Sequence, residues 1–312
     1  MIQPSDIFNI NSEQAFQKQA LEVFKYQFEN NIVYRSFEDI PFLPIQFFKS
    51  HKVLCSTAAV QKTFTSSGTT GQTTSKHFVT DLSVYEESFQ LAFDSFYGKV
   101  ENYVVLALLP SYLERDGSSL IYMADTLIKQ SKQPESGFYL NNLEALKNTL
   151  LTLESDNRKV LLIGVSFALL DLVAHHQFKL KNTIIMETGG MKGRRKELIR
   201  KELHDLLKDG FGVDKIHSEY GMTELLSQAY SKGHGIFNCP PWMHVLTRDT
   251  EDALTIQELG KTGGLNIIDL ANINSCSFIA TQDLAKIHSD GSFEIIGRFD
   301  NSDIRGCNLM AL

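Results

Sequence analysis

The feature that most constrains the fold of this chain is the alternation of short apolar runs with amphipathic segments. Continuous runs of β-branched residues are typical of strands that are buried on both faces of a sheet. The predicted strands occupy residues 103–109, 159–165, 182–190 and 214–221, and the run pattern is clearest in the first two. The intervening segments predict helices near residues 118–132, 142–154, 166–176 and 193–208. This order predicts an α/β fold with a mostly parallel sheet that is flanked by helices.

Two further segments and a change of pattern complete the predicted organisation. Residues 12–30 carry apolar side chains at helical spacing, and Ser83 with Glu86 forms a capping box that predicts the start of another helix. After about residue 240 the chain consists of short predicted strands separated by turns. We therefore expect an α/β core over residues 1–240 and a smaller β-rich subdomain of the same unit over residues 241–312.

The composition argues against several partners and locations. The net charge of −7 is the opposite of the clustered positive charge that nucleic-acid binding needs, so no nucleic-acid partner is expected. The N-terminus lacks the basic patch and apolar run of a secretory signal, and the longest apolar runs are too short to cross a bilayer. The four cysteines include no CxxC pair, which indicates reduced thiols. These features predict a cytoplasmic enzyme without a membrane span.

A loop rich in glycine and hydroxyl side chains is the most informative local motif. It contains Ser66, Ser67, Gly68, Thr69, Thr70 and Gly71. Glycine lets backbone amides turn toward a ligand, and hydroxyl groups supply further donors to phosphate oxygens. The GxxxxGK[ST] pattern of a P-loop is absent from the sequence. On its own the motif indicates either a phosphate-binding loop or a flexible surface loop.

Three motifs follow this loop in a fixed order. They are Tyr220-Gly221-Met222-Thr223-Glu224, Thr281-Gln282-Asp283 and Gly297-Arg298-Phe299-Asp300. In content and order the four motifs resemble those of the adenylate-forming superfamily, which includes acyl-CoA synthetases, luciferases and the adenylation domains of peptide synthetases. Four spaced motifs are far more specific than one. The resemblance implies the fold of the large N-terminal domain of these enzymes, and activation of a carboxylic acid with ATP.

The resemblance assigns the nucleotide site to matching residues. Residues 66–71 would bind the β- and γ-phosphates of ATP, and Gly189 and Gly190 would let the adenine approach the backbone closely. Tyr220 would stack on the adenine, with Gly221 beside it in the nucleotide site. A flat aromatic ring suits a purine face, and a tyrosine with a satisfied hydroxyl also suits a protein core.

The catalytic roles that the resemblance implies fall on Thr223, which would hydrogen-bond the α-phosphate or the acyl carbonyl, and on Glu224, which would hold Mg²⁺. Attack of a carboxylate on the α-phosphorus brings negative charges together, so a metal ion and fixed donors must neutralise them. A carboxylate is the hard oxygen ligand that Mg²⁺ prefers. Asp283 would bind both ribose hydroxyls, and Arg298 would lie against the ribose and phosphate. Asp283 also suits a turn after a strand.

Three further segments narrow the resemblance to one branch. They are FLPIQFFK at residues 42–49, GGMKGRRKE at residues 189–197 and IRGCN at residues 304–308. These segments resemble the bacterial acyl-protein synthetases, the fatty-acid-activating subunits of luminescence fatty-acid reductases. Phenylacetate–CoA ligases are the next nearest match, with a shared YGMTE block. The resemblance implies a fatty acid as substrate, ATP and Mg²⁺ as cofactors, and an acyl reductase as partner.

The C-terminal segment departs from most of the superfamily. Only twelve residues follow Asp300, whereas a mobile domain with a catalytic lysine usually follows this position, so we expect that domain to be absent. Acyl-protein synthetases pass the acyl group to a cysteine of their own chain near the C-terminus, and Cys307 occupies such a position. A thiolate is the nucleophile in such a step, and the neighbouring Arg305 favours it. The alternative is a small residue buried in a terminal strand.

The sequence also offers candidate residues for the pocket that binds the acid, and it leaves two rival functions open. Lys192 is a candidate contact for phosphate or carboxylate, although an exposed basic helix explains it equally well. Met222 and Trp242, in and after the YGMTE block, are candidates for the wall of the acyl pocket. The rival functions are an acyl- or aryl-CoA ligase that takes its missing domain from a separate protein, and a non-catalytic binder of nucleotide or acyl groups. An acyl carrier protein is a further candidate partner.

Overall fold

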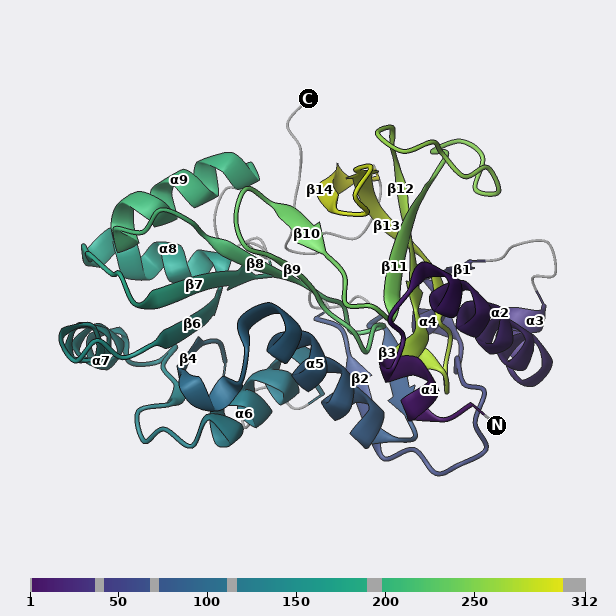
Figure 1. Ribbon diagram of the computed structural model, residues 1–312, viewed down its shortest axis with the longest axis horizontal. Coiled ribbons are helices and arrows are strands. Elements are labelled where there is room, and N and C mark those ends of the chain that lie inside the picture. Colours follow the sequence, from purple (N-terminus) through teal and green to yellow (C-terminus); the bar gives the residue numbers. More distant parts are fainter. Residues whose placement is uncertain (1, 37–41, 68–72, 111–116, 190–197, 300–312) are drawn as a thin grey trace.

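The computed structural model describes residues 2–36, 42–67, 73–110, 117–189 and 198–299 (Figure 1). The helices are α1 (Pro4–Phe8), α2 (Glu13–Asn30), α3 (Ile32–Arg35), α4 (Phe47–Ser50), α5 (Leu82–Tyr97), α6 (Ser119–Ser131), α7 (Leu143–Ser155), α8 (Ser166–His175), α9 (Arg200–Phe211) and the 3₁₀ turns η1 (Val100–Asn102) and η2 (Leu270–Asn272). The strands are β1 (Leu43–Pro44), β2 (Lys62–Thr65), β3 (Lys76–Val79), β4 (Val104–Leu108), β5 (Gly137–Phe138), β6 (Val160–Val165), β7 (Thr183–Thr188), β8 (His217–Tyr220), β9 (Ala229–Ser231), β10 (Ile236–Asn238), β11 (Met243–Arg248), β12 (Thr262–Asp269), β13 (Phe278–Ile287) and β14 (Phe293–Arg298).

Twelve of the described strands form one sheet in the order β11-β12-β13-β14-β10-β9-β8-β7-β6-β4-β5, with β1 paired to β13. Strands β5, β4, β6, β7 and β8 are parallel to one another. From β8 through β9, β10, β14, β13 and β12 to β11 the pairing is antiparallel. The predicted fold class, a parallel sheet with helices and a β-rich C-terminal part, is confirmed.

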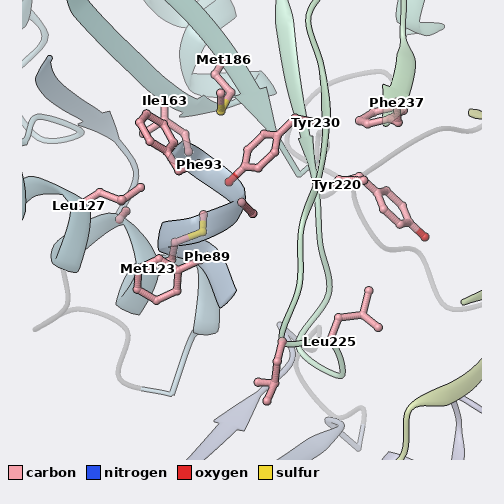
Figure 2. Close-up of a cluster of buried hydrophobic side chains, with 14 of the residues drawn as sticks. Phe89, Phe93, Met123, Leu127, Ile163, Met186, Tyr220, Leu225, Tyr230 and Phe237 are labelled. Atoms are coloured by element: carbon pink, nitrogen blue, oxygen red, sulfur yellow. The ribbon is translucent and has the colours of Figure 1, made fainter. Parts of the chain in front are cut away.

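The parallel strands carry apolar side chains on both faces because helices cover both faces. All residues of β4 and β6 are buried. Figure 1 shows α8 and α9 on one side of these strands and α5 and α6 on the other. The side chains that fill the space beneath the sheet are drawn in Figure 2 and include Phe89, Phe93, Met123, Leu127, Ile163 and Met186. The hydrophobic core therefore lies on both faces of the parallel strands, as expected for strands whose apolar side chains do not alternate with polar ones.

The predicted elements agree with the structure except at two helix starts. Helix α9 begins at Arg200, later than the predicted residue 193, and residues 193–197 lie outside the described residues. The capping box at Ser83 is wrong. Asp81 is the N-cap of α5, and its side chain accepts hydrogen bonds from the backbone N–H and the hydroxyl of Ser83. A carboxylate two residues upstream therefore takes the capping role.

The C-terminal strands are joined to the rest of the molecule by long-range contacts. Strand β10 pairs with β14, so the sheet continues across residue 240, and the division at that residue stays a prediction. The N-terminal helix α2 packs on the same part of the chain, where the side chain of Gln27 donates to the carbonyls of Asn272 and Ile273. In the described part of the chain, no helix combines the length and apolar character that a membrane crossing requires.

Candidate active site

A cavity of about 170 Å³ lies at the carboxyl ends of the parallel strands. Leu109 follows β4, Val165 ends β6, Gly189 follows β7 and Gly221 follows β8, and all four line it. In open α/β sheets this edge is where ligands usually bind, because loops and backbone groups diverge there. Asp283 of β13 lines the cavity from the antiparallel part of the sheet. The cavity thus lies between the two parts of the sheet.

The predicted phosphate loop and the YGMTE block meet at this cavity. Ser66 and Ser67, after β2, line it together with Met222 and Thr223. The hydroxyl of Ser66 accepts a hydrogen bond from the backbone N–H of Ser75 at 2.9 Å, which ties the two ends of the loop together. Gly68, Thr69, Thr70 and Gly71 lie outside the described residues.

A buried polar cluster links Tyr220, Asp283 and Arg298. The hydroxyl of Tyr220 donates to Asp283 Oδ2 at 2.7 Å, and Arg298 Nε lies 3.0 Å from Asp283 Oδ1. Asp283 and Arg298 are register partners on β13 and β14, so the hairpin sets their distance. The ring of Tyr220 packs edge-on against Phe237 and Phe293. The residues assigned to adenine, ribose and phosphate are therefore in direct contact with one another.

Two glycines at strand ends keep the cavity open. Gly189 adopts φ +61°, in the left-handed region that favours glycine. A Cβ on Gly221 would lie 2.4 Å from Glu219 Oε1, so any side chain at this position would displace that carboxylate. Gly190, Lys192 and Cys307, to which the sequence also assigned roles, lie outside the described residues.

Buried side chains hold the backbone of the YGMTE block in place. His77 Nδ1 lies 2.9 Å from the carbonyl of Thr223, and Asn272 Nδ2 donates to the carbonyl of Glu224 at 2.8 Å. Because a carbonyl only accepts, Nδ1 of His77 carries the proton, and Nε2 accepts from Ser275 Oγ at 3.0 Å. Burial lowers the pKa of His77 to about 4, so the ring is neutral near pH 7. These contacts position Thr223 at the cavity.

Asp269 holds the residues that follow the block. Its carboxylate accepts hydrogen bonds from the backbone N–H groups of Leu226, Ser227 and Ala271 and from the hydroxyl of Ser227. Glu224 itself is fully buried and does not line the cavity, whereas its neighbour Thr223 does. The β12–η2 corner therefore determines the path of the chain after Glu224.

Trp242 does not line the cavity, which corrects its predicted place in the acyl pocket. Its indole N–H lies within hydrogen-bond distance of Ser88 Oγ (3.1 Å) and Ser227 Oγ (3.0 Å), and its ring packs edge-on against Phe8. A buried indole needs a partner for its N–H, and the two serines provide one inside the core. Met222 lines the cavity, and its role in an acyl pocket stays a prediction.

The cavity also contains residues that sequence reasoning missed. Tyr85 of α5 and Leu120, Ile121 and Met123 of α6 form an apolar wall. Thr188, Glu219 and Gln228 are buried and polar. The hydroxyl of Thr188 donates to Glu219, and burial together with the charge of Glu187 raises the pKa of Glu219 to about 7. Thr188 and Glu219 are register partners near the ends of β7 and β8. A polar residue near the end of each predicted strand was the sequence signal that could have indicated their meeting.

Known structures share this fold. No family model and no curated protein sequence matches the chain. ATP-bound MatB from Rhodopseudomonas palustris is similar, with a TM-score of 0.57, 16% identity, and coverage of 78% of this chain and 49% of MatB. A 2-hydroxyisobutyryl-CoA ligase in the postadenylation state has a TM-score of 0.62 and 10% identity, with coverage of 96% of this chain and 70% of the ligase. The long-chain-fatty-acid-CoA ligase FadD1 from Archaeoglobus fulgidus has a TM-score of 0.54 and 15% identity, with coverage of 77% of this chain and 51% of FadD1.

These similarities show that the chain shares the fold of the matched part of these ligases, in agreement with the predicted fold class. The chain spans about half the length of MatB and of FadD1. At these levels of identity the similarity concerns the fold alone, so the chemistry of this chain has to be argued from its own cavity.

Proposed function

We propose that this protein activates a carboxylic acid with ATP to form an acyl-adenylate and pyrophosphate. One observation carries the proposal. A single cavity is lined by Ser66, Gly189, Tyr220, Thr223 and Asp283, which come from distant parts of the sequence. Ser66, Tyr220, Thr223 and Asp283 come from three of the four motifs, and the resemblance assigns them, with Gly189, to the phosphates, adenine, ribose and reacting centre. The shared fold with ligases whose structures hold ATP or an acyl-adenylate supports the same chemistry.

In the proposed reaction a carboxylate oxygen of the acid attacks the α-phosphorus of ATP. The new bond joins that oxygen to phosphorus, the bond from the α-phosphorus to the bridging oxygen breaks, and pyrophosphate leaves with the electron pair. Ser66 and Ser67 bind the β- and γ-phosphates, and Asp283 binds the ribose hydroxyls. Thr223 orients the α-phosphate or the acyl carbonyl, and Arg298 adds positive charge. Fixed donors of this kind stabilise charge without reorganisation during the reaction.

Mg²⁺ is the proposed cofactor, and Glu224 is its proposed ligand. A nucleotide-bound Mg²⁺ usually takes one or two protein carboxylates and completes its shell with phosphate oxygens and water. Thr223 lines the cavity, but Glu224 itself is fully buried and does not line it, so this role rests on the motif and requires the Glu224 side chain to turn toward the cavity. When bound, the ion neutralises the charge that builds up on the phosphates.

Carboxylate-dependent ATP–pyrophosphate exchange tests the proposal. We expect exchange that requires both Mg²⁺ and a particular acid in a panel of fatty and aromatic acids. Glu224→Gln should lower its rate roughly a hundredfold, because a charge-neutralising group is lost. The exposed Glu29 provides the matched control, and Glu29→Gln should leave the rate unchanged. Nucleotide binding without exchange for any acid would favour the non-catalytic alternative.

We further propose that a fatty acid is the substrate and that the acyl group then passes to the thiol of Cys307. In that step the thiolate attacks the acyl carbonyl carbon, and the bond to AMP breaks. The other three cysteines of the chain are poor acceptors. Cys55 and Cys276 are buried, Cys239 is partly buried, and burial raises the pKa of each thiol, in Cys55 to about 12. The thioester would then serve an acyl reductase or a carrier protein.

Labelling with radioactive fatty acid and ATP tests this transfer. We expect an acyl-protein that neutral hydroxylamine cleaves, because thioesters react with hydroxylamine readily. Cys307→Ser should lose this label but retain pyrophosphate exchange, whereas Cys239→Ser should keep both. A hydroxylamine-labile label that survives Cys307→Ser would contradict the role of Cys307.

Coenzyme A is the second candidate acceptor. One similar ligase structure holds coenzyme A together with an acyl-adenylate. Formation of acyl-CoA from acid, ATP and coenzyme A, by the chain alone or after addition of a separate partner protein, would favour this acceptor over Cys307.

A further inference from the structure

The strand that carries Asp283 does not pair evenly with its neighbour. The register between β12 and β13 shifts between Gly264 and Asn266, so that residues 281–283 of β13 lie opposite Leu265 alone. Such a β-bulge bends the strand, interrupts the regular ladder and redirects side chains, and bulges are frequent beside active sites. The direction of the Asp283 side chain therefore depends on the shape of this bulge.

Arg248 of β11 joins the two strands at the bulge. Its Nη1 donates to the carbonyl of Leu265 at 3.0 Å and to Oδ1 of Asn266 at 2.7 Å, both on β12. Its Nη2 donates to the carbonyl of Thr281 on β13 at 2.6 Å. A planar guanidinium group presents several donors in a fixed geometry, which a lysine does not. Arg248 thus satisfies acceptors on both sides of the irregular pair.

Thr281 extends this network to the backbone of Asp283. Its hydroxyl donates to the carbonyl of Leu265 at 2.8 Å and accepts from the backbone N–H of Asp283 at 3.1 Å. The carbonyl of Leu265 therefore accepts from both Arg248 and Thr281. Leu265, Thr281 and Asp283 are all buried, so these hydrogen bonds are not exchanged for water. One connected set of bonds leads from the arginine to Asp283.

Packing fixes the guanidinium group in this position. Its Cζ lies over the ring of Phe299, 5.4 Å from the ring centroid. A Cβ on Gly264 would lie 2.7 Å from Arg248 Cζ and 2.8 Å from the ring of Phe299, so any side chain there would displace one of them. The backbone N–H of Phe299 donates to the carbonyl of Gln282 at 3.0 Å. The contacts of the arginine thus reach the bulge from the side of β14 as well.

Arg248 does not touch the carboxylate that it helps to place. Asp283 accepts from the hydroxyl of Tyr220 and pairs with Arg298, and each of its oxygens has a second lone pair for a ribose hydroxyl. Asp283 lines the cavity, whereas Arg248 does not. Any effect of Arg248 on a bound nucleotide therefore has to pass through the backbone of residues 281–283.

We infer that Arg248 is a positioning residue for the nucleotide, which holds the bulge at residues 281–283 so that Asp283 meets the ribose hydroxyls. This inference rests on the proposed function and adds to it a residue that lies outside all four motifs. Without the guanidinium group, the buried carbonyls of Leu265 and Thr281 each lose a donor, so the bulge relaxes to find other partners. A displacement of about 1 Å in a binding group is enough to impair a site.

Nucleotide selection in pyrophosphate exchange tests the inference. The assay compares ATP with 2′-deoxy-ATP, which lacks one of the hydroxyls that Asp283 is proposed to bind. Wild type should prefer ATP by roughly tenfold or more in kcat/KM, because a site built to bind a hydroxyl rejects the analogue without it. Arg248→Met should reduce this preference to roughly twofold or less. It should raise the KM for ATP about tenfold with a smaller change in kcat, since lost ground-state binding appears in KM.

Two further variants separate positioning from a general loss of stability. Arg158→Met is the matched control, because Arg158 is also partly buried and donates to the side chain of Gln133 at 2.8 Å but does not line the cavity. It should keep the wild-type preference for ATP. Thr281→Val removes a single hydroxyl and should lose the preference as Arg248→Met does. The double variant should lose little more than either single one, because both interrupt the same network.

The outcomes distinguish this inference from the proposed function. A wild-type preference for ATP that persists in Arg248→Met overturns the inference and leaves adenylation standing. If Arg248→Met does not fold, a preference that persists in Thr281→Val does the same. Equal use of ATP and 2′-deoxy-ATP by wild type also overturns it, because no ribose contact is then being positioned. Absence of exchange with every acid contradicts the proposed function, and the inference with it.

Discussion

Replacement of Asp283 by alanine should lower the free energy of unfolding by about 3–5 kcal/mol, because it removes one partner of a buried ion pair. The side chain of Arg298 is only 5% exposed, so its charge loses the carboxylate at 3.0 Å without gaining water. The hydroxyl of Tyr220 loses its acceptor in the same change. Under the proposed function the variant also loses exchange activity, because the ribose hydroxyls lose their acceptor.

Chemical denaturation and a nucleotide-binding assay together check this prediction. Asp283→Asn keeps an acceptor for Tyr220 and should be less destabilising than alanine, while it still weakens ribose binding. Asp205→Ala is the matched control, since Asp205 pairs with Lys201 and Lys208 on the surface, where such pairs contribute at most about 1 kcal/mol. If Asp283→Ala lowers the free energy of unfolding no more than Asp205→Ala does, the predicted contribution of the buried ion pair to stability is contradicted.

Replacement of His77 by alanine should also cost about 3–5 kcal/mol of stability and should lower the exchange rate. The side chain is 1% exposed and packs edge-on against Phe48. Its loss leaves a void and removes the donor to the carbonyl of Thr223 and the acceptor for Ser275. Without this donor the backbone at Thr223 should shift. Because Thr223 lies at the cavity, this shift should reduce the turnover rate more than it raises the KM for ATP.

The pH dependence separates the imidazole from simple packing. The folded-state pKa of His77 is about 4, below the ordinary value near 6.5, so the unfolded chain binds the proton first as the pH falls. The stabilising contribution is therefore full above pH 6.5 and is lost as the pH falls toward 4. Wild type should lose about 3 kcal/mol more than His77→Asn between pH 7 and pH 4.

His77→Asn is also the conservative variant for activity. Its amide N–H can replace the Nδ1 donor to Thr223, so it should recover much of the exchange rate that alanine loses. His217, whose pKa burial also lowers to about 4, is present in both proteins and cancels from the difference. An identical pH profile for wild type and His77→Asn would show that His77 does not titrate in this range.

The fold was predictable where the pattern of apolar residues depends on local burial. Strands β4, β6, β7 and β8 lie within the predicted segments, and β4 and β6 are uninterrupted apolar runs because both of their faces are covered. The start of α5 was mispredicted because both Asp81 and Ser83 are capping residues, and only the backbone geometry decides between them. The antiparallel pairing of β10 with β14 could not be predicted, since it joins segments with no shared pattern.

The candidate site was predictable as a set of motifs but not as a binding surface. Ser66, Tyr220, Thr223 and Asp283, which the motifs assign to one site, line one cavity, and their roles there stay a prediction. Trp242 was misplaced because sequence proximity to the YGMTE block does not reveal that two serines satisfy its indole in the core. Gln228 was missed because it belongs to no motif, in a segment that mixes polar and apolar residues, and only the structure places it at the cavity.

The pairing of the chain's first and last parts has a consequence for the order of folding. Gln27 bonds to residues 245 and 246 positions further along, and Leu43 of β1 pairs with Ile279 of β13. Contacts of such long range slow folding, because the loop between them must close before they can form. On the ribosome, helix α2 gains these contacts only after residues 272 and 273 have been synthesised, whereas the parallel strands can assemble earlier. The cavity, which needs both β8 and β13, is thus completed only after β13 has been synthesised.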